Sequence, residues 1–156
     1  NNKEGYHRLI KINTTASKDG FYYNPRADFK TLKKHWNDKD LSLCVPFYDS
    51  FLHRNAIHGT LCVPNFDFTN PTFFIEDNDL YIDQVIQRHI KKHCENGCES
   101  QEVKSIFYKN REDFKSYLTF RCINNRSTLD KPELEGMNSS EFCLQSWRET
   151  NGRALA

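Results

Sequence analysis

The chain carries six cysteines, and an even number of cysteines is the sequence feature that most restricts how it can fold. Six thiols can close up to three disulfides, and such cross-links stabilise a domain whose hydrophobic core is modest. We therefore expect a disulfide-stabilised fold. The cysteines are Cys44, Cys62, Cys94, Cys98, Cys122 and Cys143.

Three Asn-x-Ser/Thr sequons accompany the cysteines, at Asn13, Asn125 and Asn138. Each is an acceptor sequence for an N-linked glycan. Disulfides and N-glycans both belong to oxidising, secretory compartments. The two signals together predict a secreted glycoprotein whose leader peptide has been removed. The sequence has no run of about 20 apolar residues, so we expect no membrane insertion.

A length of 156 residues fits one domain, 1–156, with an ordered core expected over about 6–147. The 22 Lys and Arg nearly balance the 21 Asp and Glu, and a net charge of +1 does not favour a nucleic-acid partner. Mean hydropathy is low, at -0.79. However, 12 Phe, 7 Tyr and 2 Trp supply apolar faces that disordered chains lack, so we expect the chain to fold.

The residue patterning predicts an α+β fold, with helices packed against an antiparallel sheet. Helices are expected over 27–36 and 80–93, and a further one is compatible with 49–62. A loop is expected over 124–140. The expected strands are 6–12, 41–47, the hairpin pair 102–108 and 117–123, and 142–147.

Two histidines, His53 and His58, stand five residues apart, and Gly59 follows the second one. Imidazole exchanges protons near neutral pH, which is what RNA cleavage by the 2'-hydroxyl requires of an acid–base pair. Two partly exposed histidines on an irregular segment would show the same spacing. The pair therefore leaves a catalytic and a non-catalytic interpretation open.

Two clusters contain residue types that bind metal ions. The first is His89, His93, Cys94 and Cys98. Its spacings lie at or beyond those of zinc sites, and a secretory chain would oxidise the thiols. The second is the acidic run Glu76, Asp77, Asp79 and Asp83. This run lacks the glycine of a twelve-residue calcium loop, and a solvated charge cluster at a helix N-terminus explains it better. We therefore expect no metal and no cofactor.

The segment 51–62, Phe-Leu-His-Arg-Asn-Ala-Ile-His-Gly-Thr-Leu-Cys, resembles the second active-site box of the ribonuclease T-two family of secreted acid ribonucleases. The two histidines, Gly59 and Thr60 keep the spacing of that family. Residues 83–98 are similar to its penultimate helix, and residues 102–108 to one of its strands. The resemblance covers about 20–143 and implies a ribonuclease T-two-like core within the α+β fold.

Departures from the family pattern imply that catalysis has been lost. Arg54 and Ile57 stand where the family has a glutamate and a lysine that stabilise charge on the phosphate. Asp19 takes the position of the histidine in the first box. Losing such groups costs several orders of magnitude in rate. His53 and His58 are then vestigial.

The family pattern also implies how the cysteines pair. It joins Cys44 to Cys62, and closing that loop would contribute about 3 kcal/mol on the chain-entropy model. It also pairs the remaining four, in an order that it does not settle: Cys94 and Cys98 with Cys122 and Cys143.

The sequence thus predicts a secreted, N-glycosylated, catalytically inactive ribonuclease T-two-like protein that acts by binding, in the manner of host-interaction and immunomodulatory glycoproteins. The expected partner is a protein or a glycan-binding receptor on a cell surface, not nucleic acid, and a homodimer stays open. One alternative is an active endoribonuclease that uses His53 and His58, with His35 or His7 supplying the missing histidine. The other alternative is an unrelated disulfide-rich binding ectodomain.

Overall fold

The computed structural model describes residues 2–95, 97–129 and 139–152, and the chain is about half helical. The described residues contain six α-helices, one short 3-10 helix and three short strands. By their internal contacts they form two compact units. The first unit is Asn1–Val45 with Pro64–Thr72, and the second is Pro46–Val63 with Phe73–Ala156.

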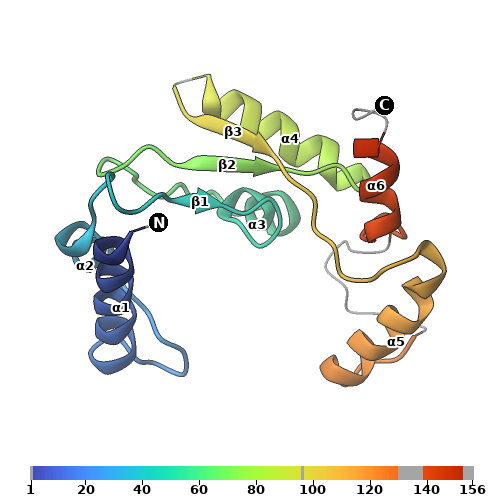
Figure 1. Cartoon of the computed structure of the whole chain (residues 1–156), viewed down its shortest axis with the longest axis horizontal. Coiled ribbons are helices and arrows are strands. Elements are labelled where there is room, and N and C mark those ends of the chain that lie inside the picture. The colour runs from blue at the N-terminus through green and yellow to red at the C-terminus, as the bar shows by residue number, and fades with distance from the viewer. Residues whose placement is uncertain (1, 96, 130–138, 153–156) are drawn as a thin grey trace. The chain divides into compact units, whose positions relative to one another are not determined.

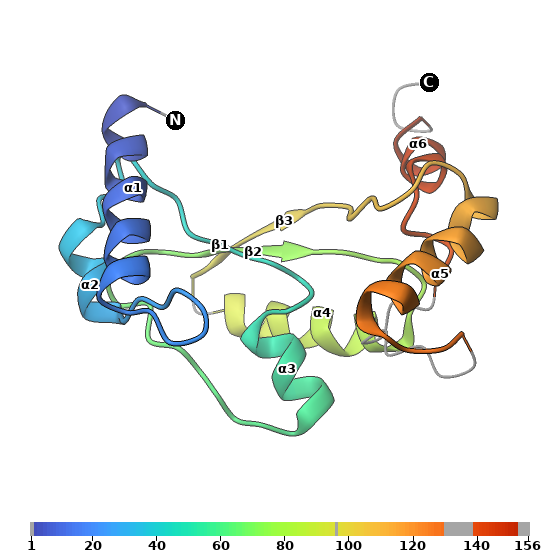
Figure 2. The ribbon, with the colours of Figure 1, turned by 90° about the horizontal axis from the view of Figure 1, so that it is seen from below.

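The first unit is built on two helices, α1 (Lys3–Lys18) and α2 (Phe29–His35). These helices lie side by side in Figures 1 and 2. Each begins at a side chain that accepts a backbone hydrogen bond, as N-cap residues do. Asn2 accepts from the N–H of Gly5 at 2.7 Å, and Asp28 accepts from the N–H of Thr31 at 2.8 Å.

Aromatic packing joins the two chain segments of the first unit. The ring of Phe68 lies 6.2 Å from that of Phe29 and 5.5 Å from that of Trp36, between ring centroids. The ring of Phe66 lies 6.5 Å from Phe29. These edge-on and tilted contacts fix residues 64–72 against α2.

The second unit places two helices on one side of its strands. Helix α3 (Phe51–His58) packs against α4 (Tyr81–Cys94), and α4 contacts strand β3 (Glu99–Glu102). Figure 2 shows both helices on the same side of β3 and of β2 (Thr72–Ile75). The fully buried apolar side chains of this unit are Phe47, Phe73, Ile86, Ile90, Phe142 and Cys143.

The sheet is parallel, with three strands in the order β1-β2-β3. Strand β1 is Cys44–Val45. Helix α3 lies between β1 and β2 in sequence, and α4 lies between β2 and β3. Connections of this length return the chain to its starting end, which makes successive strands parallel. The expected antiparallel sheet and ribonuclease T-two-like core are therefore wrong.

Three expected strands are helical in the structure. Residues 6–12 lie in α1, residues 117–123 lie in α5 (Phe114–Asn125), and the end of 142–147 lies in α6 (Leu144–Gly152). A 3-10 helix, η1 (Arg111–Asp113), leads into α5. The hairpin expected over 102–123 is thus a strand end followed by a helix.

Several other expectations are confirmed. Helix α2 lies within 27–36, α4 nearly coincides with 80–93, and α3 lies within 49–62. Strand β1 lies within 41–47. Most of the loop expected over 124–140 lies outside the described residues.

All six cysteines are free thiols, which corrects the prediction of a disulfide-stabilised fold. Cys122 and Cys143 are 4% and 0% exposed and fill the core as small apolar side chains. The Sγ of Cys94 donates to the backbone carbonyl of Glu99 at 3.9 Å, and burial raises the pKa of the Cys94 thiol. Cys44 is exposed. The cysteines therefore act as ordinary packing and surface residues.

This arrangement predicts the number of reactive thiols. We expect the chain, unfolded in iodoacetamide without a reductant, to gain six carbamidomethyl groups, because each cysteine is free. Intact mass spectrometry measures this number, and a sample reduced before alkylation supplies the reference mass. A mass lower by two or more adducts in the unreduced sample would show a disulfide and contradict the structure.

Candidate functional site

Helix α3 carries both candidate histidines, but it places them differently. His53 is 2% exposed, and its ring lies edge-on to Tyr48 at 5.6 Å. Its Nδ1 accepts a hydrogen bond from the N–H of Asp49 at 3.4 Å. His58 is exposed in the last turn. Five residues rotate a side chain by about 140° around a helix, so the rings do not share a face as an acid–base pair would.

The Gly-Thr-Leu-Cys sequence after His58 forms the turn that ends α3. Gly59 caps the helix in the left-handed region, at φ 64°. The Oδ1 atom of Asn55 accepts from the hydroxyl of Thr60 at 2.6 Å and from the N–H of Cys62 at 3.1 Å. Its amide nitrogen donates to the carbonyl of Cys62 at 2.8 Å. The motif that resembles a ribonuclease box therefore holds a helix end in place.

The acidic run divides into buried and exposed members. Asp83 is 0% exposed in the first turn of α4. Its carboxylate accepts from the hydroxyl of Tyr48 at 2.7 Å, from the N–H of Asn78 at 2.8 Å and from the N–H of Leu80 at 3.3 Å. Burial raises the pKa of Asp83 and also that of Tyr48. Asp83 thus lies at the N-terminus of α4, as the sequence suggested for this run, but Asp83 and Glu76 are buried and not solvated as expected.

Glu76 is the second buried carboxylate and lies just after β2. It accepts from both the N–H and the hydroxyl of Ser105, at 2.9 and 2.7 Å, and from the amide of Asn78 at 3.0 Å. These bonds attach the segment after β3 to the end of β2. In residues 2–95, 97–129 and 139–152, no group of three or more His, Cys, Asp or Glu side chains is placed to hold a metal ion.

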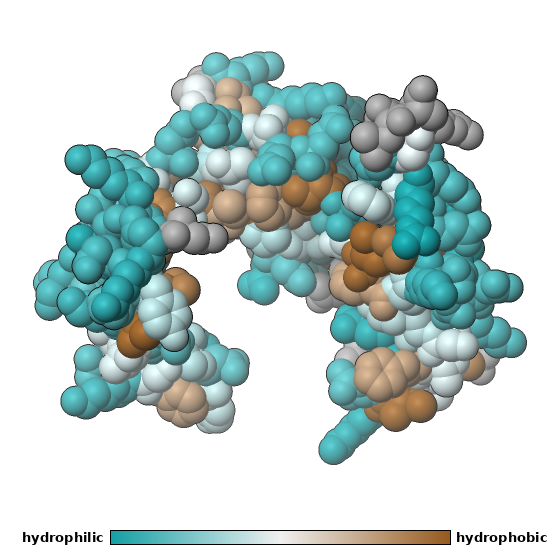
Figure 3. Space-filling model, in the orientation of Figure 1, coloured by the Kyte–Doolittle hydropathy of each residue, from teal (hydrophilic) through white to brown (hydrophobic). Residues whose placement is uncertain are grey.

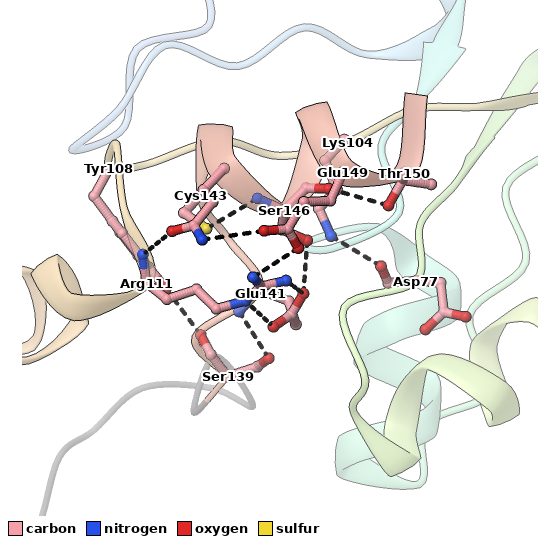
Figure 4. Close-up of polar contacts among 11 residues, drawn as sticks. Asp77, Lys104, Tyr108, Arg111, Ser139, Glu141, Cys143, Ser146, Glu149 and Thr150 are labelled. Carbon is pink, nitrogen blue, oxygen red and sulfur yellow. Dashed lines mark hydrogen bonds and ion pairs between the residues drawn. The ribbon is translucent and has the colours of Figure 1, made fainter. Parts of the chain in front are cut away.

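A third polar cluster joins η1 to α6 (Figure 4). Arg111 binds Glu141 through two nitrogens, at 2.8 and 3.0 Å, and binds Glu149 through a third at 2.7 Å. The hydroxyl of Ser146 donates to Glu141 at 2.6 Å. The Arg111 guanidinium lowers the pKa of Glu141 to about 2 and also lowers that of Glu149. Because these donors are occupied by Glu141 and Glu149, Arg111 has a structural role and holds η1 against α6.

The second unit also contains a cavity of about 440 Å³ beside α4, β3 and α6. Two lysines and one partly exposed tryptophan, Trp147, lie among three carboxylates in its wall. Lys104 donates to the backbone carbonyl of Asp77 at 3.1 Å. Because the charges nearly cancel, the wall selects no charged class of ligand. Its charged members are Glu76, Asp77, Lys91, Glu102 and Lys104.

The balanced charge of the whole chain hides an uneven distribution between the two units. The first unit has nine Lys and Arg against six Asp and Glu, which gives it a net charge of +3. The second has 13 against 15, a net charge of -2. Within the first unit, Asp40 pairs with Arg8 at 3.0 Å and Asp67 with Lys33 at 2.6 Å. The first unit is therefore the cationic part of the protein.

The same unit exposes three consecutive aromatic rings between α1 and α2. Phe21, Tyr22 and Tyr23 are 62%, 63% and 80% exposed. This loop follows the C-terminal end of α1 in Figure 1, where the surface in Figure 3 turns from teal to white and brown. The family resemblance places the first ribonuclease box on these residues, but their exposure could not be predicted from it.

The sequons are placed unequally. Asn13 is exposed on α1, and Asn125 is the last residue of α5. Asn138 lies outside the described residues. In the described part of the chain, no helix is both long enough and apolar enough to cross a bilayer.

Comparison with known proteins finds a similarity to a DNA polymerase subunit. No family model matches the chain. The chain is similar to DNA polymerase III subunit alpha from Thermus aquaticus, with 24% identity over 155 residues. This similarity covers 93% of the chain and 12% of the polymerase subunit. The chain therefore spans about an eighth of the length of this relative.

Proposed function

We propose that the chain functions in DNA replication as a segment related to the alpha subunit of a bacterial DNA polymerase III, and that it contributes DNA binding. The observation that carries this proposal is the similarity to the Thermus aquaticus subunit through 93% of the chain. Because that similarity reaches only 12% of the subunit, the proposal concerns one part of the work of a polymerase.

The charge distribution supports DNA binding through the first unit. Lysine and arginine side chains that neutralise DNA phosphates release condensed counterions, which favours association. The first unit supplies the net positive charge of +3, and the second unit, with -2, opposes contact with phosphates. The sequence-based argument against nucleic acid used the charge of the whole chain and so averaged two unlike surfaces.

The polar clusters of the second unit support a binding role over a catalytic one. Asp83 and Glu76 each accept three hydrogen bonds from protein donors, and Arg111 is held by two carboxylates. His53 and His58 lie on different sides of α3. These side chains hold the fold together. We therefore keep the sequence-based proposal that the chain acts by binding. Secretion, glycosylation and a cell-surface receptor stay predictions.

Binding to a labelled primer–template DNA tests the proposal. We expect fluorescence anisotropy to show micromolar affinity at low salt. The logarithm of the association constant should fall linearly with the logarithm of salt concentration, with a slope of about -2 to -3, because about three phosphates are neutralised. The absence of binding at any salt concentration would contradict the proposal.

A matched pair of charge reversals tests which unit binds. The variant Lys30→Glu/Lys34→Glu changes two exposed lysines of the first unit, and Lys91→Glu/Lys92→Glu changes two exposed lysines of the second. Both variants alter the net charge by the same amount. We expect the first to lower DNA affinity by at least about tenfold and the second to lower it much less. Equal losses would refute the assignment to the first unit.

A further inference from the structure

The loop that joins α1 to α2 is closed at its base. The N–H of Gly20 donates to the carbonyl of Thr15 at 3.1 Å, and the N–H of Arg26 donates to the carbonyl of Gly20 at 3.2 Å. The two backbone strands come so close that a Cβ at position 20 would overlap the carbonyl oxygen of Arg26. Only glycine fits there, and the loop is fixed at both ends.

The top of the loop is also held by its own contacts. The N–H of Tyr22 donates to the carbonyl of Asn24 at 3.2 Å. Tyr23 adopts the left-handed region, at φ 59°, which a bulky residue disfavours. The rings of Tyr22 and Tyr23 meet edge-on with centroids 4.8 Å apart. The loop therefore presents its rings in a defined arrangement instead of as a flexible strand.

Cations border these rings. The guanidinium of Arg26 lies 5.2 Å from the centroid of the Tyr22 ring. Lys18 is in the last turn of α1, and Lys30 is in the first turn of α2. All three cationic side chains belong to exposed residues. The stretch 18–30 carries these three cations against two carboxylates, Asp19 and Asp28, so exposed aromatic faces occur there with a small excess of positive charge.

This combination has the chemistry of a single-stranded nucleic-acid contact. Every unpaired base offers a flat face to an aromatic side chain, and lysine and arginine bind the phosphates beside it. In a duplex the bases are already stacked on one another, so their faces are not available to the loop. A fixed loop also loses little conformational entropy when it binds.

We propose that the loop Gly20–Arg26 binds single-stranded DNA, with unpaired bases stacked on Tyr23 and Phe21 and with Arg26 and Lys18 contacting phosphates. This inference rests on the proposed DNA-binding function and deepens it by naming the form of DNA and the residues. Tyr23 is the main stacking platform because it is the most exposed of the three rings, and Arg26 already lies over the ring of Tyr22.

Substitution of Tyr23 tests the inference. We expect Tyr23→Ala to lower the affinity of the whole chain for a labelled oligothymidine by about tenfold, as loss of one stacked base does. Tyr23→Phe keeps the ring and should bind like the original chain. Tyr81→Ala is the matched control, because Tyr81 is also 80% exposed but lies on α4 of the second unit. It should leave the affinity unchanged.

Phe21→Ala gives a second, independent measurement with the same expected loss. Circular dichroism verifies that each variant is folded. If the chain binds DNA but the Tyr23→Ala and Phe21→Ala variants bind oligothymidine as tightly as the original chain, the loop proposal is wrong and the DNA-binding function stands. Equal affinity for oligothymidine and for a duplex of the same length also overturns it. If the chain binds neither DNA, both proposals fail.

Discussion

Replacing Asp83 by alanine is expected to lower the free energy of unfolding of the second unit by about 3 kcal/mol. The carboxylate is fully buried and accepts hydrogen bonds from Tyr48, Asn78 and Leu80. Alanine leaves these three donors without their acceptor, and water has no direct access to replace it. Urea denaturation followed by far-ultraviolet circular dichroism measures the loss.

Asp77→Ala is the matched control for Asp83→Ala. Asp77 belongs to the same acidic run, but it is exposed, and its carboxylate accepts from the N–H of Asp79 at 3.2 Å. We expect a change of no more than about 0.5 kcal/mol. Similar losses from the two variants would mean that the buried hydrogen bonds of Asp83 do not stabilise the fold as argued.

The second large effect is expected at Gly20. Gly20→Ala should lower the free energy of unfolding of the first unit by about 2 kcal/mol, because the new Cβ would overlap the Arg26 carbonyl oxygen and force the backbone strands apart. The displaced loop no longer presents its rings in the same arrangement. We therefore also expect about a tenfold loss of affinity for oligothymidine, although no aromatic or charged side chain is removed.

Gly152→Ala supplies the comparison for Gly20→Ala. Gly152 ends α6, and outside its own helix nothing in the described part of the chain lies within 4 Å of the position where its Cβ would be. This variant should keep both stability and DNA affinity. If Gly20→Ala also kept both, the closed base would not control the shape of the loop, and the proposed preorganisation would be wrong.

The sequence predicts α4 well because several independent signals agree there. Apolar residues recur at helical spacing, and Ile86 and Ile90 indeed face the core. Asp83 caps the first turn, and Lys91 and Lys92 stand in the last one. When periodicity, capping and charge agree in this way, a helix can be predicted from the sequence without any tertiary information.

The sequence misleads at α1 and α5 because β-branched and aromatic residues are good strand formers. In α1 the apolar side chains of Tyr6, Leu9 and Ile10 are exposed, so they do not form the buried apolar face that predicts an amphipathic helix. The cap that starts α1 is a local signal, because Asn2 accepts from the N–H of Gly5 three residues later. The strand propensity of residues 6–12 outweighed it in the prediction. In α5, Phe120 and Ile123 are also exposed, so both faces of the helix carry apolar residues.

The disulfides predicted from the number of cysteines are absent among the residues that the structure describes for a different physical reason. Parity permits disulfides but does not place sulfur atoms near one another. Cys122 and Cys143 pack in the core as free thiols, and free cysteine is among the most buried residue types in proteins. Once no pair forms, the argument from cross-links to an oxidising compartment loses its support.

The candidate sites were only partly visible in the sequence. The aromatic run Phe21–Tyr23 can be read directly, but its exposure depends on the close approach of Gly20 and Arg26. The bond between Tyr48 and Asp83 joins residues 35 positions apart, and local patterns carry no information about it. The charge separation emerges only when the two units are known.

Photochemical crosslinking of the whole chain to a 5-iodouracil-labelled single strand tests the central claim most directly. Trypsin cleaves after Lys18 and after Arg26, so the eight-residue loop peptide 19–26 is released as one fragment. We predict that mass spectrometry finds the crosslinked nucleotide on this peptide, at Tyr23 or Phe21. Crosslinks confined to peptides of the second unit, or none at saturating DNA, would contradict the account.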